Sequence, residues 1–351
     1  MSYPKLSIVV PTFNRKDYLK ESLDSIINQN YPNLEIVITD DNSTDGTEEL
    51  CKDYIKSYPF IKYVKNIKYP QGPNGNKNNG LDYCSGKIIG IFDDDDTMVD
   101  GALKLMVDKL LEGYDVVMGN CKIVSNRRDN GEFAGLGLNE DCEVDWKDYM
   151  CGKISGEYWS IFKKEILGNK RFDIDLYGGE GTLWRGMLKG KKIYYLHKAV
   201  RNYRINEESV IHNMANKADK AIKNYERDIE YYGDDMSKTC PCYLASIYKG
   251  ASYYAKLSSQ YKKGFLYILK GIRLCPKLKS LYVMFVVMFM PKSIVPLLSK
   301  IRVFFKYKKT FRYIFKTILL CSKNSKAYIV FIVALLPVSI IKKLQSLKDK
   351  L

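Results

Sequence analysis

Four consecutive aspartates, Asp93 to Asp96, directly follow the apolar run Ile88–Phe92. Four adjacent carboxylates repel one another and raise one another's pKa unless a cation lies among them. Because alternate side chains of an extended segment face the same way, Asp93 and Asp95 can converge on one ion. Oxygen ligands of this kind suit Mg²⁺ or Mn²⁺, with a substrate diphosphate completing the coordination shell. The alternative is a solvated acidic turn that caps a helix over Val99–Leu111.

A second pair of acids, Asp40 and Asp41, closes the apolar run Leu34–Thr39. One explanation is a turn that leads into a helix, with Ser43 or Thr44 as the N-cap. That explanation accounts for the cap but not for two adjacent carboxylates at the end of a buried run. A carboxylate in such a place can accept the N–H group of a nucleotide base.

Both acidic groups fall where strands end in an alternating pattern of strands and helices. The strand patterns are Leu6–Val10, Leu34–Thr39, Ile61–Val64 and Ile88–Phe92. The helical patterns are Lys16–Gln29, Thr44–Ser57 and a segment that follows the Gly- and Asn-rich stretch Gly72–Gly80 and ends near Ser85. This order predicts a parallel α/β sheet covered by helices, of the nucleotide-binding type. Function in such sheets lies at the carboxyl ends of the strands, where these acids and Thr12–Arg15 fall.

The chain that follows is predicted to complete the same domain. Strand patterns at Val116–Met118 and Ile193–Tyr195 flank a Gly-rich segment, Tyr177–Gly181. We therefore expect residues 1–213 to form one domain with two halves, 1–112 and 113–213. Residues 214–260 have a helical pattern rich in Lys and Tyr, and we interpret them as a helical connector.

Charge separates the end of the chain from the rest. The whole chain carries a formal net charge of +16, while residues 261–351 hold 20 Lys and Arg against one acid, Asp349, a net of +19. Subtracting +19 from +16 leaves −3 for residues 1–260. A basic tail of this size favours an anionic partner, and its apolar runs favour a membrane surface over nucleic acid. The run Ala327–Ile341 is about 22 Å long as a helix, short of the ~30 Å needed to span a bilayer.

The basic tail contains an internal duplication. Residues 261–298 align with residues 307–344 at an offset of 46, and 18 of the 38 aligned pairs are identical. Each copy has a Lys-rich aromatic helix followed by an apolar helix, Leu281–Met290 or Ala327–Leu336. We expect two equivalent helical hairpins that lie on an anionic membrane surface. The alternative is a helical subdomain packed on the α/β domain.

The composition argues against several other classes of protein. With 46% hydrophobic and 27% charged residues, the chain is too apolar for a disordered protein. Nine cysteines without paired zinc spacing and only two histidines argue against a Cys/His zinc site and against a Ser-His-Asp triad. We interpret the cysteines as reduced, cytosolic side chains. The run Leu6–Val10 is too short for a signal-peptide core, so we expect no secretion.

Four motifs together resemble the family 2 glycosyltransferases. They are Pro11-Thr12-Phe13-Asn14-Arg15, Asp40-Asp41-Asn42-Ser43-Thr44-Asp45-Gly46-Thr47, Lys77-Asn78-Asn79-Gly80 and Phe92-Asp93-Asp94-Asp95-Asp96. The resemblance covers residues 5–210, and four motifs in this order and spacing are specific. It implies the GT-A fold, with the donor half at 1–112 and the acceptor half at 113–213. It also implies an inverting enzyme that uses nucleotide-diphosphate sugars.

The resemblance also implies roles for residues near the donor. It places Pro11, Thr12, Asn14 and Arg15 around the donor, with the first two lining the nucleoside pocket. Asp41 is expected to bind the base, usually uracil.

The resemblance extends to the diphosphate end of the donor. Lys77 stands where the family often has Arg. Asp93 and Asp95 match the two ends of the family's Asp-any-Asp motif. Asp93 is expected near the ribose or diphosphate, Asp94 beside the donor, and Asp95, with Asp93, on Mn²⁺ or Mg²⁺.

Two further residues near the closing end of the site are implied in the same way. Tyr203-Arg204 resembles the family's usual Tyr-Arg pair, from which Arg204 can neutralise the leaving diphosphate. The alternative for Arg204 is an ordinary surface residue after a strand. His212 either touches the diphosphate or metal or is incidental.

The sequence departs from the family pattern at the catalytic base. The family commonly has Glu-Asp at this place, and this chain has Glu180-Gly181. We predict Glu180 as the base, because flanking glycines let the backbone bring a carboxylate close to the anomeric carbon. Asp173 and Asp175 are the competing acids. Alternatively, Glu180 only caps a helix that begins near Thr182.

The implied reaction is a single displacement with inversion, in which a base activates the acceptor oxygen while the metal stabilises the departing nucleoside diphosphate. The expected acceptor is a hydroxyl of a glycan or of a polyprenyl-diphosphate-linked oligosaccharide, in cell-surface polysaccharide synthesis. We expect a peripheral protein on the cytoplasmic face of the cell membrane. Two alternatives remain, a degenerate GT-A domain that binds nucleotide or glycan as a scaffold, and a nucleotidyl transferase. No nucleic-acid partner is expected.

Overall fold

The computed structural model describes residues 3–125, 128–176, 178–205 and 218–289. The chain forms two compact units, residues 1–281 and 282–351. His212, the predicted domain boundary at residue 213 and the second copy of the tail repeat, 307–344, lie outside the described residues. The predicted domain bounds and the paired hairpins therefore stay predictions.

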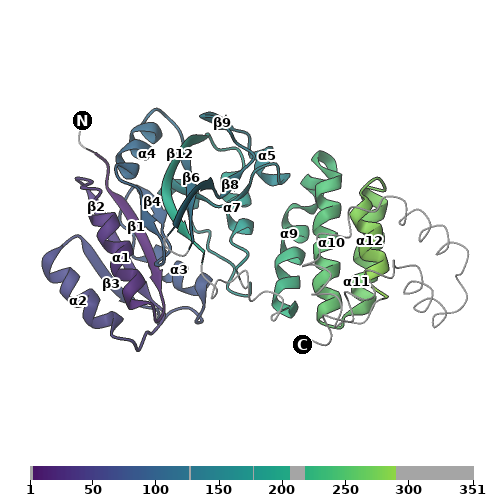
Figure 1. Ribbon diagram of the computed structural model, residues 1–351, viewed down its shortest axis with the longest axis horizontal. Helices are drawn as coiled ribbons and strands as arrows, with labels where there is room; N and C mark the ends of the chain where they lie inside the picture. The colour runs from purple at the N-terminus through teal and green to yellow at the C-terminus, as the bar shows by residue number, and fades with distance from the viewer. Residues whose placement is uncertain (1–2, 126–127, 177, 206–217, 290–351) are drawn as a thin grey trace, which may run out of the picture. The chain divides into compact units, whose positions relative to one another are not determined.

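A ten-stranded sheet forms the centre of the first unit (Figure 1). Its strands are β1 (Leu6–Thr12), β2 (Leu34–Asp40), β3 (Ile61–Lys65), β4 (Ile88–Ile91), β5 (Thr97–Met98), β6 (Val116–Ser125), β7 (Arg128–Phe133), β9 (Cys142–Val144), β11 (Tyr158–Lys163) and β12 (Ile193–Arg204). Their order is β3-β2-β1-β4-β11-β6-β12-β5, with β7 on β6 and β9 on β12. A separate two-stranded sheet pairs β8 (Gly135–Leu136) with β10 (Ser155–Gly156).

The direction of the strands divides the sheet into two halves. β3, β2, β1 and β4 are parallel neighbours, as the alternating pattern predicted. β11 runs antiparallel to both β4 and β6, and β12 returns parallel to β6. The fold is therefore mixed α/β, and the predicted fold class is confirmed.

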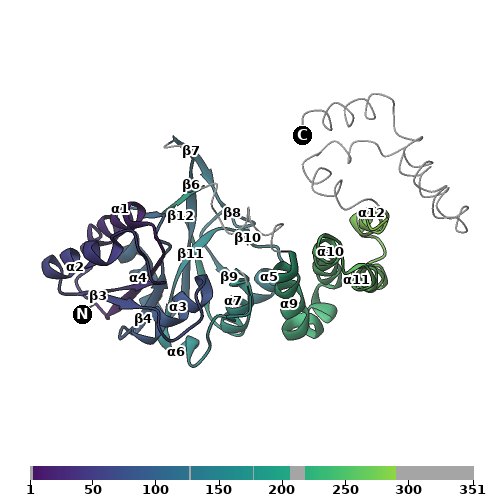
Figure 2. The same cartoon turned by 90° about the horizontal axis from the view of Figure 1, so that it is seen from below.

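Helices cover both faces of this sheet (Figure 2). They are α1 (Lys16–Ile27), α2 (Thr47–Ser57), α3 (Pro73–Asp82), α4 (Ala102–Leu111), α5 (Trp146–Met150), α6 (Lys164–Leu167) and α7 (Gly181–Leu188). The first core cluster joins α1, α2 and α4 to one face of the sheet, and the second joins α3, α6 and α7 to the other. Within β1, Leu6, Ile8 and Val10 belong to the first cluster, whereas Val9 belongs to the second.

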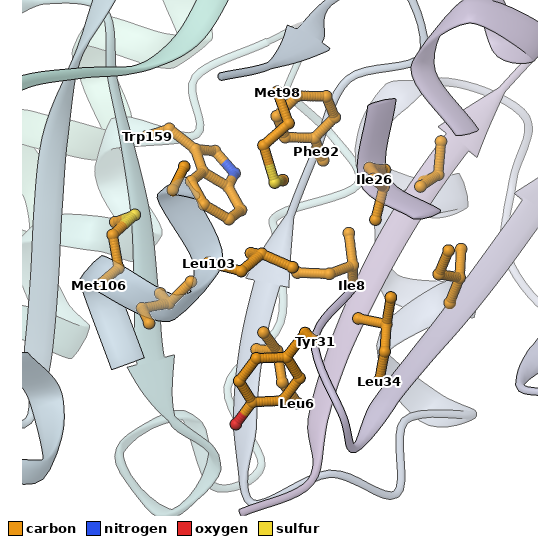
Figure 3. Close-up of a cluster of buried hydrophobic side chains, with 14 of the residues drawn as sticks. Leu6, Ile8, Ile26, Tyr31, Leu34, Phe92, Met98, Leu103, Met106 and Trp159 are labelled. Atoms are coloured by element: carbon orange, nitrogen blue, oxygen red, sulfur yellow. The ribbon is translucent and has the colours of Figure 1, made fainter. Parts of the chain in front are cut away.

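The first cluster fixes the end of β4, where the acidic run begins (Figure 3). Phe92 is fully buried and packs edge-on against Trp159 of β11, with 5.4 Å between ring centroids. The Trp159 indole N–H donates to the Ile91 carbonyl oxygen at 2.7 Å. Each such aromatic side chain contributes about 1.5–3 kcal/mol through burial alone, so the backbone just before the aspartates is firmly held.

The prediction that Gly72–Gly80 precedes a helix is wrong, because α3 runs through this stretch. Gly80 is required for close packing, since a Cβ there would lie 2.5 Å from the Val9 side chain. The side-chain amide N–H groups of the α3 asparagines donate hydrogen bonds to groups on neighbouring elements. Asn76 donates to the Thr12 carbonyl at 3.1 Å, and Asn78 donates to the Phe172 carbonyl at 2.9 Å. The helix is therefore stabilised by packing and side-chain hydrogen bonds rather than by helix propensity.

The predicted caps of α2 are also wrong. α2 begins at Thr47, preceded by Gly46 with φ of 89°. Asp45 accepts hydrogen bonds from the Thr47 backbone N–H at 3.2 Å and from its hydroxyl at 2.5 Å. Ser43 instead donates to Asp40 at 2.5 Å, so its hydroxyl stabilises the turn at the end of β2.

Four helices follow the sheet: α9 (Ala218–Thr239), α10 (Pro241–Leu257), α11 (Tyr261–Leu274) and α12 (Lys279–Val287). α9, α10 and α11 lie side by side in the first unit (Figure 1). Met236, Leu244 and Ile247 of these helices form a buried cluster with Met150 of α5. The first helix of the basic tail is thus part of the packed unit. Within the residues that the structure describes, none of the helices is both long enough and apolar enough to cross a membrane.

The interpretation of all cysteines as reduced thiols is wrong. Cys151 is bonded to Cys240, and Cys242 to Cys275, with Cα atoms 5.8 and 4.9 Å apart. The partners are 89 and 33 residues apart in the sequence, so local spacing gives no sign of the pairing. The first bridge ties the end of α5 to the junction of α9 and α10, and the second ties α10 to the end of α11.

Replacing Cys151 by Ser should lower the free energy of unfolding by about 2–4 kcal/mol, because the bridge to Cys240 closes a long loop in the unfolded chain. Urea unfolding without reductant measures the loss. Cys142→Ser is the matched control, since Cys142 forms no disulfide with any described residue. Equal loss in both variants, or wild-type stability that does not change with reductant, would contradict the bridge.

Candidate active site

The carboxyl ends of β1, β2 and β4 bring the predicted donor residues to one edge of the sheet. Thr12, at the end of β1, lies opposite Asp40 in the parallel ladder. The Asp41 backbone N–H then donates to the Thr12 carbonyl oxygen at 3.0 Å. Pro11 lies one position earlier, opposite Thr39. The ends of the first two strands are therefore joined where the sequence placed a nucleoside pocket.

Lys77 lies at the centre of this edge. It comes from α3, and its side chain is only 7% exposed. Its ammonium nitrogen lies 3.2 Å from Asp93 Oδ1 and also pairs with the Glu180 carboxylate. Burial alone would lower the pKa of Lys77, but these two carboxylates outweigh burial and raise it. A charged lysine thus links the end of β4 to the loop that carries the predicted base.

Arg201 is a second buried cation, which no sequence pattern indicated. It comes from β12 and is 3% exposed. Its guanidinium lies 3.2 Å from Asp93, from Asp96 and from Glu157. A single Arg inside a strand pattern carries no signal of this contact, because the partners are 44 to 108 residues away.

The four aspartates have different surroundings. Arg15 pairs with Asp94 at 3.3 Å and with Asp95 at 2.9 Å. Burial raises the pKa of Asp94 to about 7 and that of Asp96 to about 8. Burial would also raise the pKa of Asp93, but Lys77 and Arg201 lower it overall. The run therefore contacts buried cations, which a solvated acidic turn would not do.

The same run was predicted to hold a divalent metal through Asp93 and Asp95. Within the described ranges, no group of three or more His, Cys, Asp or Glu side chains is gathered to hold a metal ion. Asp93 is 41% exposed and Asp95 19% exposed at the side chain, so both can reach a ligand. Two carboxylates completed by substrate phosphates are a usual setting for Mg²⁺. The residues therefore fit a metal that arrives with a diphosphate, and not a metal held by protein groups alone.

Asp41 and Asn14 are held by hydrogen bonds within the protein. Asp41 is buried and accepts from the Asn66 amide at 2.8 Å and from the Gly72 N–H at 2.7 Å. Burial raises its pKa. Each carboxylate oxygen has a second lone pair, so a further donor can bind. Asn14 accepts from the Thr44 N–H at 2.8 Å and joins the loops that follow β1 and β2.

Arg204 lies apart from the buried cations. Its guanidinium pairs with Glu21 at 2.5 Å and lies over the ring of Tyr18, 4.8 Å from the centroid. Its backbone N–H donates to Asp96 at 2.8 Å. The structure thus brings the guanidinium of Arg201, rather than that of Arg204, into contact with the acidic run.

The loop before α7 presents Glu180 to Lys77. Gly178 and Gly179 have φ of 68° and 72°, a conformation that only glycine adopts at little cost. Among the described residues, the Glu180 side chain makes no capping hydrogen bond at α7. The alternative of a simple helix cap is therefore not what this geometry shows.

The two competing acids lie elsewhere. Asp173 pairs with Arg227 at 2.6 Å, and the side chain of Asp175 is 67% exposed. Of the three acids, Glu180 is the one that contacts Lys77, which also binds Asp93.

An α/β sheet with polar and charged side chains gathered at the carboxyl ends of its parallel strands has the arrangement of the nucleotide-binding folds. The sequence model of the family described as "Glycosyl transferase family 2" matches residues 7–167 of this chain. The chain is 42% identical over 309 residues to the GalNAc(5)-diNAcBac-PP-undecaprenol β-1,3-glucosyltransferase of Campylobacter jejuni, covering 86% of this chain and 98% of that protein. The chain belongs to glycosyl transferase family 2.

Two further proteins are similar to this chain. The chain is 30% identical to the UDP-Glc:α-D-GlcNAc-diphosphoundecaprenol β-1,3-glucosyltransferase WfgD of Escherichia coli, over 74% of this chain and 97% of that protein. Among solved structures, TarS of S. aureus in complex with UDP-GlcNAc superposes with a TM-score of 0.53 at 19% identity, over 77% of this chain and 89% of that one. The likeness to TarS shows the GT-A fold.

Asp94 and Asp96 should make the metal-free protein less stable as the pH rises from about 6 to about 9. With pKa values of about 7 and about 8, the folded protein keeps two protons that the unfolded chain releases near pH 4. Because the folded state binds more protons in this range, its stability falls as the pH passes through these values.

Melting temperatures in EDTA at four pH values measure this slope. Asp96→Asn stays neutral at every pH and should flatten the slope, whereas the exposed Asp100→Asn should leave it unchanged. A melting temperature that rises across this range would refute the assigned protonation.

Proposed function

We propose that the chain is an inverting glycosyltransferase that transfers a sugar from a UDP-sugar to a hydroxyl of a polyprenyl-diphosphate-linked glycan, in the synthesis of a cell-surface polysaccharide. The names of the two glucosyltransferase relatives, which both specify undecaprenyl-diphosphate acceptors, support the acceptor class. The name of the Escherichia coli relative and the TarS complex support a uridine nucleotide. One observation carries the proposal, the buried Lys77 that binds both Asp93 and Glu180.

Each side chain has a part in this reaction. Asp41 binds the uracil, and Lys77 carries a charge toward the diphosphate. Glu180 takes the proton from the acceptor hydroxyl as that oxygen attacks the anomeric carbon from the face opposite the leaving group. Asp93 and Asp95 would hold Mg²⁺ or Mn²⁺, which supplies charge stabilisation to the departing diphosphate when bound.

The acceptor approaches from the side of α9. A hollow beside the base is lined by Gly179, Gly181, Asn224, Tyr225 and Asp228. The aromatic ring of Tyr225 and the amide of Asn224 suit a sugar ring with several hydroxyls, whereas the Asp228 carboxylate is bound within the protein by Thr182 and Arg185. A lipid-linked acceptor also suits a protein that works at a membrane surface, which is where we place the basic tail.

The second candidate is a scaffold that binds nucleotide or glycan without turnover. The observation that favours it is Gly181, which stands where the family commonly has Asp. The contact between Glu180 and Lys77 favours the enzyme, because it brings a carboxylate beside the donor residues.

Nucleotide binding tests the donor site. Thermal shifts with UDP, GDP, CDP and dTDP, each with and without Mn²⁺, should show stabilisation by UDP that depends on the metal. Asp95→Ala should lose the metal-dependent part. Stabilisation by none of these nucleotides would remove the basis for a donor site.

Turnover tests the base. With UDP-glucose and a synthetic polyprenyl-diphosphate-linked N-acetylhexosamine, Glu180→Gln should lower kcat by about 10²-fold or more, while UDP binding is retained. Asp175→Asn, which replaces the exposed competing acid, should keep wild-type kcat. Activity that survives in Glu180→Gln would assign the base elsewhere, and nucleotide binding without turnover in the wild type would favour the scaffold.

A further inference from the structure

The helix that follows the α/β domain holds the start of α7, directly after Glu180. Asp228 of α9 accepts from the Thr182 hydroxyl at 2.9 Å. The Arg185 guanidinium donates to both Asp228 oxygens at 2.7 Å. The Tyr232 hydroxyl donates to the Thr182 carbonyl oxygen at 2.6 Å. Three contacts from one helix thus fix the first turn of α7.

The other side of the loop is held by α3. The Asn74 amide is buried and donates to the Gly178 carbonyl at 2.9 Å and to the Asp173 carbonyl at 2.8 Å. The Asp173 side chain in turn pairs with Arg227, the residue before Asp228 in α9. The loop is therefore attached at both ends, to α3 on one side and to α9 on the other.

These attachments matter because the loop itself has little stiffness. Glycines stand on both sides of Glu180, at Gly178, Gly179 and Gly181. Glycine has the largest conformational freedom of any residue, so the sequence alone does not fix the carboxylate. A displacement of about 1 Å at a reacting group can cost about 10²-fold in rate. The position of Glu180 therefore depends on groups outside the loop.

We propose that Asp228 is a positioning residue for the reaction, acting on Glu180 through Thr182 and Arg185, with Tyr232 in the same role. The inference rests on the proposed function of Glu180 as the base. The residues that support the reaction would then include some in the helices that follow the sheet, beyond residues 7–167, which the family model matches.

The pair of helices contains a matched control. Lys189, at the end of α7, pairs with Asp235 of α9 at 2.6 Å. Asp235 lies two helical turns after Asp228 and joins the same two helices, but at the end of α7 far from Glu180. Asp228→Asn and Asp235→Asn are therefore the same change in the same helix, and only the first touches the turn that follows the base.

We expect Asp228→Asn to lower kcat by about tenfold or more, with the KM for UDP-glucose and the affinity for UDP unchanged. Asp235→Asn should keep wild-type kcat. Because partial unfolding also lowers apparent kcat without changing KM, kcat is calculated per mole of enzyme that binds UDP, so that the loss reports misplacement of the base rather than an unfolded fraction. An Asp228→Asn enzyme with wild-type kcat would overturn the proposal.

Two milder changes keep the test decisive if Asp228→Asn does not fold, since it leaves the Arg185 charge without its partner. Thr182→Val removes one hydroxyl and should lower kcat, while Thr182→Ser keeps the hydroxyl and should restore it. Tyr232→Phe removes only the hydrogen bond to the Thr182 carbonyl and should act like Thr182→Val. Wild-type kcat in both Thr182→Val and Tyr232→Phe would overturn the proposal.

The two hypotheses fail in different ways. If Glu180→Gln is active, the assignment of the base fails and the positioning role fails with it. If Glu180→Gln is inactive while the variants at Asp228, Thr182 and Tyr232 keep wild-type kcat, only the positioning role fails.

Discussion

Crowding of carboxylates at the end of β4 is the constraint on which the rest of this site depends. Asp93 to Asp96 follow a fully buried aromatic residue, and two of the four aspartates are themselves buried. Buried carboxylates are costly unless cations or protons accompany them. The protein meets this need with Arg15 from the end of β1, Lys77 from α3 and Arg201 from β12. Segments separated by nearly two hundred residues must therefore converge on one strand end.

That need explains several features that otherwise look unrelated. α3 must approach the sheet closely for Lys77 to reach Asp93, which is why Gly80 faces Val9 and Thr39. β12 must extend well past its pairing with β9 for Arg201 to arrive at the same place. The raised pKa values of Asp94 and Asp96 let protons neutralise the part of the carboxylate charge that the three cations leave unpaired.

Local sequence patterns were enough for β1 to β4, β6, β12 and most helices, because each contains a short run of apolar residues. They did not indicate β11, which joins the two halves of the sheet, or the order of the strands. The resemblance to family 2 glycosyltransferases singled out Lys77, Asp93 and Glu180, which the structure brings into contact. Local patterns failed for α3, whose helix is specified by packing against β1 and β2. They also failed for the disulfides and for Arg201, because partners distant in the chain leave no trace in local spacing.

The composition of α3 has a consequence for the order of folding. A ten-residue helix that contains four asparagines and two glycines has little tendency to form alone, and isolated helices of this length are marginal even in favourable sequences. Its hydrogen bonds go to Thr12, Thr39 and Phe172, on elements that must already be in place. We therefore expect α3 to form after the strands that it contacts have paired. In that order of folding, the lysine that joins the aspartates to Glu180 would be the last of the three cations to reach them.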